Sequence, residues 1–227
     1  NDNIHPGYGL SEASPLVSAN PTYGPNRQES VGRPCPRTTV KLVDLDNPDK
    51  IVDIGRPGEV LVKGPQVMKG YHNRPEETSQ TLKDGWLHTG DTAIMDEDYF
   101  LTIIDRKKRM IIVNGNNVYP GPIEQLLSAH PSIAECVIIG LPDERSGEAA
   151  KAYIRLKAGQ EGKITADELR EFLGERINRL EIPKFITFVT EELPKTSVGK
   201  PDWKTLQDRE RAHLAQMNND ASTPEPN

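Results

Sequence analysis

The pattern of apolar residues changes near Asp105, and this change constrains the fold of the 227-residue chain more than any other feature. Before it, short alternating runs rich in β-branched residues are separated by turns of glycine, proline and asparagine, which is typical of β-strands. After it, strand-like runs alternate with residues at helical spacing, as in an α+β domain. The sequence therefore predicts an α+β protein: a β-rich unit over residues 1–104, an α+β unit over residues 105–210, and a disordered tail over residues 211–227.

The expected strands of the β-rich unit are short and lie between turns, which is consistent with a distorted barrel or the edge of a sandwich. They cover residues 39–45, 59–63, 86–87, 93–96 and 100–104, and a short helix covers residues 75–82.

The clearest helix of the α+β unit covers residues 165–180. Thr165 and Glu168 form a capping box, and apolar residues follow at helical spacing. The other expected elements are strands at 110–113, 134–139, 151–156 and 185–189, and helices at 122–130 and from about residue 202 onward.

Composition excludes several classes of protein. The net charge is −6, whereas a general binder of nucleic acid presents a basic surface. No apolar run is long enough to span a bilayer, and residues 1–6 lack the features of a secretory signal. Cys35 and Cys136 have neither CxxC nor metal-site spacing, so we expect free thiols, a reducing compartment and a cytoplasmic protein.

Two stretches of the β-rich unit could carry chemistry. Residues 8–12, Y-G-L-S-E, combine an aromatic ring, a hydroxyl and a carboxylate, a set that can stack on a planar ring, bind an oxyanion and hold Mg²⁺. In H-T-G-D, Asp91 follows a turn glycine, where a fixed carboxylate suits a ribose diol. From the residues alone, an ordinary polar loop and an Asx turn remain open as alternatives.

Three further stretches lie in the second unit. The cluster D-R-K-K-R at 105–109 could bind a phosphate or ribose, or be a solvated linker. N-G-N-N at 114–117 could bring backbone close to a ligand, or be a plain hairpin turn. Lys200 ends a flexible loop and could reach a phosphoryl or carboxylate oxygen, but Pro201 follows it and the spacing of a P-loop is absent.

These stretches, taken together and in order, resemble the adenylate-forming superfamily of acyl-CoA and aryl-CoA synthetases, luciferases and peptide-synthetase adenylation domains. The motifs are Y-G-L-S-E at 8–12, G-E-V-L-V-K-G at 58–64, G-Y at 70–71, G-W-L-H-T-G-D at 85–91, D-R-K-K-R-M-I at 105–111, N-G-N-N-V-Y-P at 114–120 and G-K at 199–200. The resemblance extends from about Tyr8 to Leu206 and is strongest to long-chain fatty-acyl-CoA synthetases.

The resemblance implies a two-step reaction with ATP, Mg²⁺ and CoA. A carboxylic acid attacks the α-phosphate of ATP to give acyl-AMP and pyrophosphate, and a thiol then displaces AMP. The small-molecule partners would be a fatty acid, ATP and CoA. The small second unit would be the family's C-terminal lid, and the first unit would be the last β-subdomain of a large N-terminal domain.

For the nucleotide, the acid and the metal, the resemblance implies roles for four residues of the first motif. Tyr8 would pack against adenine, Gly9 would line the acyl pocket, and Ser11, where the family more often has threonine, would bond the α-phosphate. Glu12 would hold Mg²⁺.

For the remaining motifs, the resemblance implies that Asp91 and Arg106 bind the ribose and that Lys108 is the hinge. Asn114 and Gly115 would line the thiol tunnel. The catalytic lysine, which bridges the carboxylate and α-phosphate in the first step, would be Lys200.

The resemblance also sets the limits of the prediction. The family's Gly/Ser/Thr-rich phosphate loop is not in this sequence, so we expect that the 227 residues alone do not form acyl-AMP. A ligase for acyl-carrier protein, an aryl-CoA ligase, a fatty-acyl-AMP ligase and a non-catalytic docking module remain alternatives. Peripheral association of the intact protein with a membrane also stays open, as does its oligomeric state.

Overall fold

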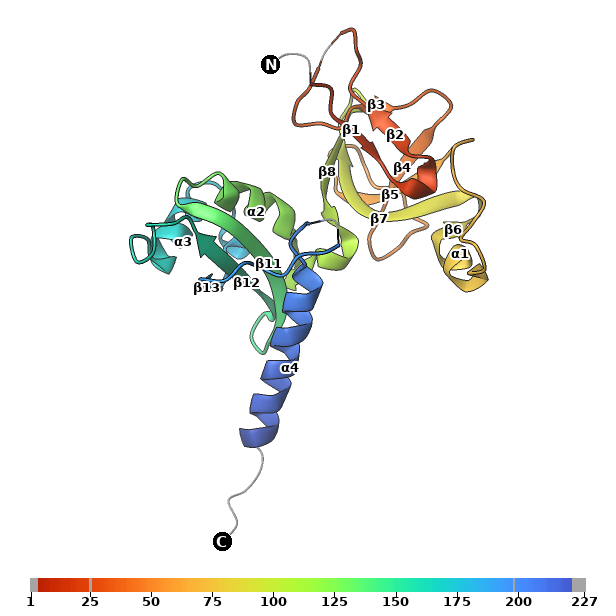
Figure 1. The fold of residues 1–227 in the computed structure, drawn as a ribbon. Helices are drawn as coiled ribbons and strands as arrows, with labels where there is room; N and C mark the ends of the chain where they lie inside the picture. The colour runs from red at the N-terminus through yellow and green to blue at the C-terminus, as the bar shows by residue number, and fades with distance from the viewer. Residues whose placement is uncertain (1–3, 25, 198, 222–227) are drawn as a thin grey trace. The chain divides into compact units, whose positions relative to one another are not determined.

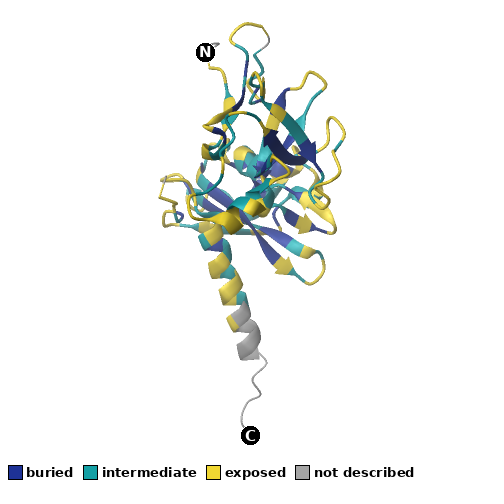
Figure 2. Ribbon diagram, turned by 90° about the vertical axis from the view of Figure 1, so that its right-hand side faces the viewer, coloured by how far each residue is buried: buried dark blue, intermediate teal, exposed yellow. Residues whose placement is uncertain are grey.

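The structure, a computed structural model, describes residues 4–24, 26–197 and 199–221. The chain divides between Lys108 and Arg109 into two compact units, close to the change of pattern at Asp105 (Figure 1). Figure 2 shows that buried residues lie mainly along the strands and exposed residues mainly on the turns.

The first unit contains two antiparallel sheets. The smaller sheet has the order β1 (Gly7–Gly9), β2 (Leu16–Ala19) and β3 (Arg33–Pro34), and a 3₁₀ turn at Ser11–Ala13 joins β1 to β2. The larger sheet consists of β4 (Thr39–Val43), β5 (Gly58–Lys63), β6 (Leu82–Lys83), β7 (Trp86–Met95) and β8 (Leu101–Arg106), with α1 (Pro75–Thr81) beside β6. Its order is β4-β5-β7-β6, and β8 also pairs with β7.

The strand β7 organises the larger sheet. The sequence pattern predicted two short strands at 86–87 and 93–96, but both lie in the single strand β7, except for residue 96. The glycine that suggested a turn, Gly90, lies inside the strand with a φ of +70°, and the pairing of β7 with both neighbours shifts register close to it. Within the described residues the sheet is open, so the barrel expected for this unit does not close.

Apolar residues from both sheets form the core of the first unit. The buried members are Ala13, Val17, Leu42, Val60, Val62, Leu87, Ala93 and Leu101. The core therefore holds the turn after β1 against β5 and β7, which positions the motifs at residues 8–12 and 88–91 on the same unit.

The second unit is a mixed sheet with helices on both faces. The sheet has the order β10 (Asn116–Val118), β9 (Ile111–Val113), β12 (Gly147–Leu156), β11 (Ile133–Asp143), and β13 (Phe185–Val189) runs parallel to β12. The helices are α2 (Pro120–Ser128), α3 (Ala166–Gly174) and α4 (Trp203–Ala221), and short 3₁₀ turns cover Lys107–Arg109 and Arg179–Glu181.

The side chains of alternate residues of β11 are buried against different helices. Cys136 and Ile138 join the core cluster that contains residues of α2 and α3, whereas Val137 and Ile139 join a cluster that contains Leu206 of α4. Both faces of this strand are covered, which explains why the sequence shows an unbroken apolar run there instead of an alternating one.

The capping box of α3 is confirmed, because Thr165 accepts a hydrogen bond from the backbone N–H of Glu168 and the Glu168 carboxylate accepts one from that of Thr165. The helix ends at Gly174 instead of residue 180, and Asn178 caps a separate 3₁₀ turn.

A disordered tail was expected from residue 211, but residues 211–221 continue the helix α4. Contacts with the sheet explain the longer helix: Glu210 accepts a hydrogen bond from Lys151 (2.7 Å), and Leu214 packs against the cluster on that face. Residues 222–227 lie outside the described part of the chain. Where the structure describes the chain, it contains no helix with the length and apolar character needed to cross a membrane.

Candidate functional site

Asp91 lies on β7 with only 8% of its side chain exposed, and two partners hold its carboxylate. The hydroxyl of Tyr8 donates a hydrogen bond to Oδ2 (2.6 Å), and Nε of Arg106 lies 2.8 Å from Oδ1. Arg106 is directly opposite Asp91 in the pairing of β7 with β8. A carboxylate has about four lone-pair positions, so it can still accept hydrogen bonds from a ligand.

Tyr8 is a fixed donor to this carboxylate. Burial raises the pKa of Tyr8 well above its usual value, and the hydrogen bond and negative charge of Asp91 act in the same direction. The phenol therefore stays protonated at physiological pH and keeps donating to Asp91. The hydroxyl of Thr89 makes two hydrogen bonds that fix the local path of the strand. It accepts one from the backbone N–H of Asp91 (3.1 Å) and donates one to the backbone carbonyl of Val60 (2.8 Å).

Gly9 allows the chain to turn back tightly after β1. A Cβ atom at this position would lie 2.1 Å from the carbonyl oxygen of Pro15, which no side chain can occupy without a shift of the backbone. The close approach lets the 3₁₀ turn at Ser11–Ala13 form between β1 and β2, and this turn carries Ser11, which is exposed, and Glu12.

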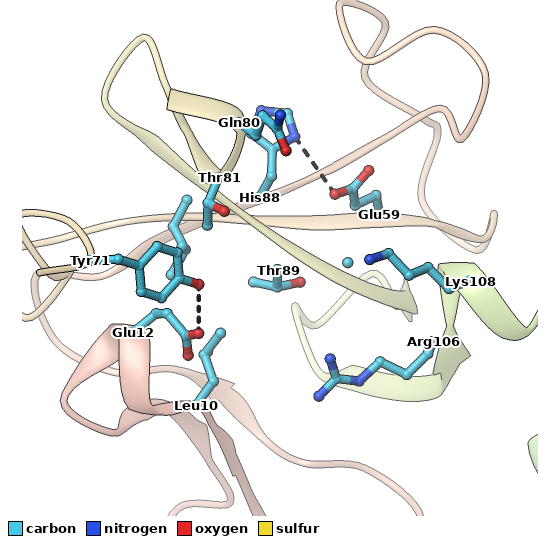
Figure 3. Close-up of a pocket in the computed structure, with 12 residues that line it drawn as sticks. Leu10, Glu12, Glu59, Tyr71, Gln80, Thr81, His88, Thr89, Arg106 and Lys108 are labelled. Carbon is cyan, nitrogen blue, oxygen red and sulfur yellow. Dashed lines mark hydrogen bonds and ion pairs between the residues drawn. The ribbon is translucent and has the colours of Figure 1, made fainter. Parts of the chain in front are cut away.

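Glu12 is held by a tyrosine from a distant part of the chain. The hydroxyl of Tyr71 donates to Oε1 of Glu12 (2.8 Å), as Figure 3 shows, and the backbone N–H of Met68 donates to the carbonyl of Glu12 (2.8 Å). Burial raises the pKa of Tyr71, and its hydrogen bond to Glu12 raises it further. The G-Y motif at 70–71 is recognisable in the sequence, but the resemblance assigned no role to Tyr71.

A cavity of about 370 Å³ lies beside these residues (Figure 3). Glu12, Tyr71, His88, Thr89, Arg106 and Lys108 contribute to its polar lining. Figure 3 shows the side chains of Arg106 and Lys108 extending into it from one side, with Glu12 and Tyr71 across from them. The cavity thus offers cations for a phosphate and hydrogen-bonding groups for hydroxyls, and Arg106 connects it to Asp91.

Glu59 was not identified as a site residue from the sequence, although it lies within a recognised motif. It is a buried acid on β5 that lies 3.0 Å from Nζ of Lys107 and 3.6 Å from Nδ1 of His88. Burial lowers the pKa of His88, and the charges of Lys83 and Lys107 lower it too, although Glu59 opposes them.

Glu12 is the carboxylate available for a metal ion at this end of the cavity. The described residues contain no group of three or more histidine, cysteine, aspartate or glutamate side chains that could hold a metal together. Mg²⁺ commonly takes one or two protein carboxylates and completes its shell with water and substrate phosphates. A single carboxylate oriented by Tyr71 fits that mode of binding, which would be completed by a phosphorylated ligand.

Three predicted site residues belong to the second unit. Asn114 and Gly115 form the two-residue loop of the hairpin between β9 and β10, and both have positive φ angles, 50° and 75°. This is the backbone of a type I′ turn, for which Asn-Gly is the favoured pair. Lys200 is exposed on a loop in which its carbonyl accepts from the N–H of Thr196 (2.7 Å). The roles expected for these residues stay predictions.

Both cysteines are free: Cys35 is half-buried and Cys136 is buried. Burial raises the pKa of Cys136 to about 11, so its thiol remains protonated.

Comparison with known proteins identifies the family. The profile of "AMP-binding enzyme" matches residues 1–72, and that of "AMP-binding enzyme C-terminal domain" matches residues 122–200. The chain is 46% identical over 208 residues to a long-chain-fatty-acid–CoA ligase of Escherichia coli O157:H7, covering 92% of this chain and 36% of the relative. It is 46% identical over 194 residues to the ligase of that name from Bacillus subtilis, covering 86% and 34%. The chain thus spans about a third of the length of these curated relatives.

Solved structures agree with the sequence comparison. ATP-bound MatB from Rhodopseudomonas palustris superposes with a TM-score of 0.82 at 30% identity, covering 92% of this chain and 41% of that chain. The o-succinylbenzoate CoA synthetase of Bacillus subtilis in complex with its acyl-adenylate gives 0.82 at 29% identity, covering 91% and 41%. With both family profiles matched in order, the chain belongs to the AMP-binding, adenylate-forming enzymes.

Proposed function

We propose that this chain is part of an ATP-dependent ligase that joins a fatty acid to CoA through acyl-AMP. In the first step a carboxylate oxygen attacks the α-phosphorus and pyrophosphate leaves. In the second, the thiolate sulfur of CoA attacks the acyl carbon and AMP leaves. The observation that carries the proposal is the buried carboxylate of Asp91, which is held by Tyr8 and by Arg106, a residue that lines the polar cavity. The names of the relatives at 46% identity support the fatty acid and CoA.

The AMP portion would bind to residues of the first unit. Asp91 would accept hydrogen bonds from the ribose hydroxyls and Arg106 would donate to the same sugar, with Tyr8 against adenine and Gly9 at the acyl pocket. The burial of Asp91 supports this role, because a hydrogen bond to a charged acceptor is stronger where water is excluded.

The phosphates would be bound by cations and by a metal ion. Ser11 would donate to the α-phosphate, and Glu12 would hold Mg²⁺, which, when bound, would neutralise charge on the phosphates. The hydrogen bond from Tyr71 supports this role of Glu12, because it fixes the direction of the carboxylate.

The second unit would supply the groups that change between the two steps. Lys200 would stabilise the charge on the carboxylate and α-phosphate during the first step, Asn114 and Gly115 would line the path of the thiol, and Lys108 would be the hinge. A large N-terminal domain of the family would provide the triphosphate loop and most of the acyl pocket. A cytoplasmic location belongs to the same proposal.

The reaction can be tested in the full-length ligase that carries this chain. With hexadecanoate, ATP, Mg²⁺ and CoA, we expect AMP and the CoA thioester to form in equal amounts. Lys200→Ala should slow acyl-AMP formation by about a hundredfold or more, because one charge-stabilising donor contributes about that much, while transfer from preformed acyl-AMP should change little. The exposed Lys157→Ala is the matched control.

Two results would contradict the proposal. The first is equal slowing of both steps by Lys200→Ala, and the second is release of ADP instead of AMP. The 227-residue chain by itself should show no ATP–pyrophosphate exchange.

A further inference from the structure

The cluster Asp105–Arg109 lies where the two units meet in sequence, and its lysine at 107 is tied to the first unit. Nζ of Lys107 lies 3.0 Å from Oε2 of Glu59, whose side chain is 7% exposed. Glu59 is on β5, an inner strand of the larger sheet. A buried carboxylate is stable as an anion only when it is paired, so this ion pair restrains Lys107 against the sheet.

Arg109 is tied in a similar way to the second unit. Its Nη2 forms an ion pair with Oε1 of Glu124 on α2, and the two side chains are only 15% and 19% exposed. The same oxygen of Glu124 accepts a hydrogen bond from the backbone N–H of Ile138 on β11 (2.7 Å). The guanidinium of Arg109 also lies over the ring of Trp203 on α4, 5.9 Å from its centroid. Arg109 is therefore held by two helices, one of which is linked to the sheet.

Lys108 lies between these two restrained residues. It is exposed, and within residues 4–24, 26–197 and 199–221 it makes no ion pair. The division between the two units follows it directly. Lys108 thus lines the cavity of the first unit without an ion pair in the described residues, and the residue on each side of it is restrained by an ion pair.

We propose that Glu59 and Glu124 are positioning residues that confine rotation between the units to Lys108. Each residue that can rotate in the segment connecting the units multiplies the number of conformations of that segment. A flexible segment of several residues would therefore sample a broad range of conformations. With Lys107 and Arg109 restrained, rotation depends on the φ and ψ angles of Lys108 alone. This favours a small number of discrete conformations of the connecting segment. The inference rests on the proposed function, in which Lys108 is the hinge.

The two glutamates have separable effects. Glu59→Gln removes the charge that holds Lys107, so the backbone motion of Lys108 should extend to Lys107, on the side of the first unit. Glu124→Gln removes the charge that holds Arg109, so the backbone motion of Lys108 should extend to Arg109, on the side of the second unit. A loss of stability alone would loosen each unit as a whole and would not follow this pattern.

Backbone ¹⁵N relaxation of the 227-residue chain tests the inference without any ligand. In the unmodified chain we expect order parameters of about 0.85 at Lys107 and Arg109, and a lower value at Lys108. Glu59→Gln should lower the value at Lys107 below about 0.6 and leave Arg109 unchanged, and Glu124→Gln should do the reverse. Glu77→Gln on α1, which removes an exposed ion pair with Arg74, is the matched control and should change neither order parameter.

If Glu59→Gln does not fold, Lys107→Met releases the same restraint and is measured at the same amide. The inference is overturned if either release leaves its neighbouring amide as rigid as in the control, or if Glu59→Gln loosens Lys107 and Arg109 equally. Because no nucleotide is present, failure of this test is distinct from failure of the proposed reaction.

Discussion

Asp91 depends on partners that are both near and far in the sequence. Thr89 is two residues away, Arg106 is opposite it on the next strand, and Tyr8 is 83 residues away. The local motif H-T-G-D was sufficient to single out Asp91. The bond to Tyr8 could not be predicted from the residues, because it requires the small sheet to meet β7.

Two other contacts were beyond sequence reasoning for the same reason. Tyr71 and Glu12 are 59 residues apart, and Lys107 and Glu59 are 48 residues apart. Each partner lies in a recognised motif, but which motifs meet is decided by strand pairing and by the core that holds the turn after β1 in place.

His88 should make the stability of the first unit depend on pH. Its pKa is lowered in the folded protein, chiefly by burial, so below about pH 6.5 the unfolded chain takes up a proton that the folded chain resists. The contribution of His88 to the free energy of unfolding should therefore be fully present above pH 6.5 and be lost as the pH is lowered below it. Urea unfolding of the 227-residue chain between pH 7.5 and pH 5, values chosen to bracket the ordinary histidine pKa, measures the effect.

The variant His88→Gln should show a smaller loss of stability over the same range. His72→Gln, at an exposed position, is the control and should keep the dependence of the unmodified chain. An identical pH dependence in His88→Gln and the unmodified chain would refute this role of His88.

Elements were predicted best where the local pattern agreed with the tertiary environment. The strand β13 has the predicted bounds, and the start of α3 is fixed by its own capping box. The strand β7 was divided in the prediction because Gly90 resembles a turn, whereas pairing on both sides keeps the strand continuous. The length of α4 was underestimated because its polar sequence contains few apolar residues, and contacts with the sheet extend it.

Leu206 anchors α4 to the sheet and should be costly to remove. It is 8% exposed and belongs to the cluster with Val137 and Ile139 of β11. Leu206→Ala should lower the free energy of unfolding of the second unit by about 2–5 kcal/mol, because it removes buried methyl groups and leaves a cavity. Trp203 is a fluorescent probe on the same helix for urea unfolding, in a Trp86→Phe background.

The exposed Lys204→Ala on the same helix is the matched control, with an expected change within about 0.5 kcal/mol. Equal effects of the two substitutions would mean that Leu206 does not anchor the helix.

At the scale of the molecule, the α+β class followed from the change of periodicity near Asp105, and the order of motifs pointed to the adenylate-forming enzymes, the family that the comparisons show. The barrel expected for the first unit is not closed in the described residues, because strand pairing at edges is not encoded in a local pattern. The residues proposed to bind AMP lie on the first unit, whereas Lys200, Asn114 and Gly115 lie on the second. The proposed reaction therefore draws on both units.

The most direct test of the central claim is the binding of AMP to the 227-residue chain, measured by calorimetry. We expect Asp91→Asn to weaken binding of AMP by about tenfold to a hundredfold, because it replaces a charged acceptor of two ribose hydroxyls. The analogue 2′,3′-dideoxy-AMP should bind the unmodified chain and Asp91→Asn equally, and the exposed Asp49→Asn should behave as the unmodified chain. If Asp91→Asn binds AMP as tightly as the unmodified chain does, Asp91 is not the ribose acceptor and the proposed site is wrong.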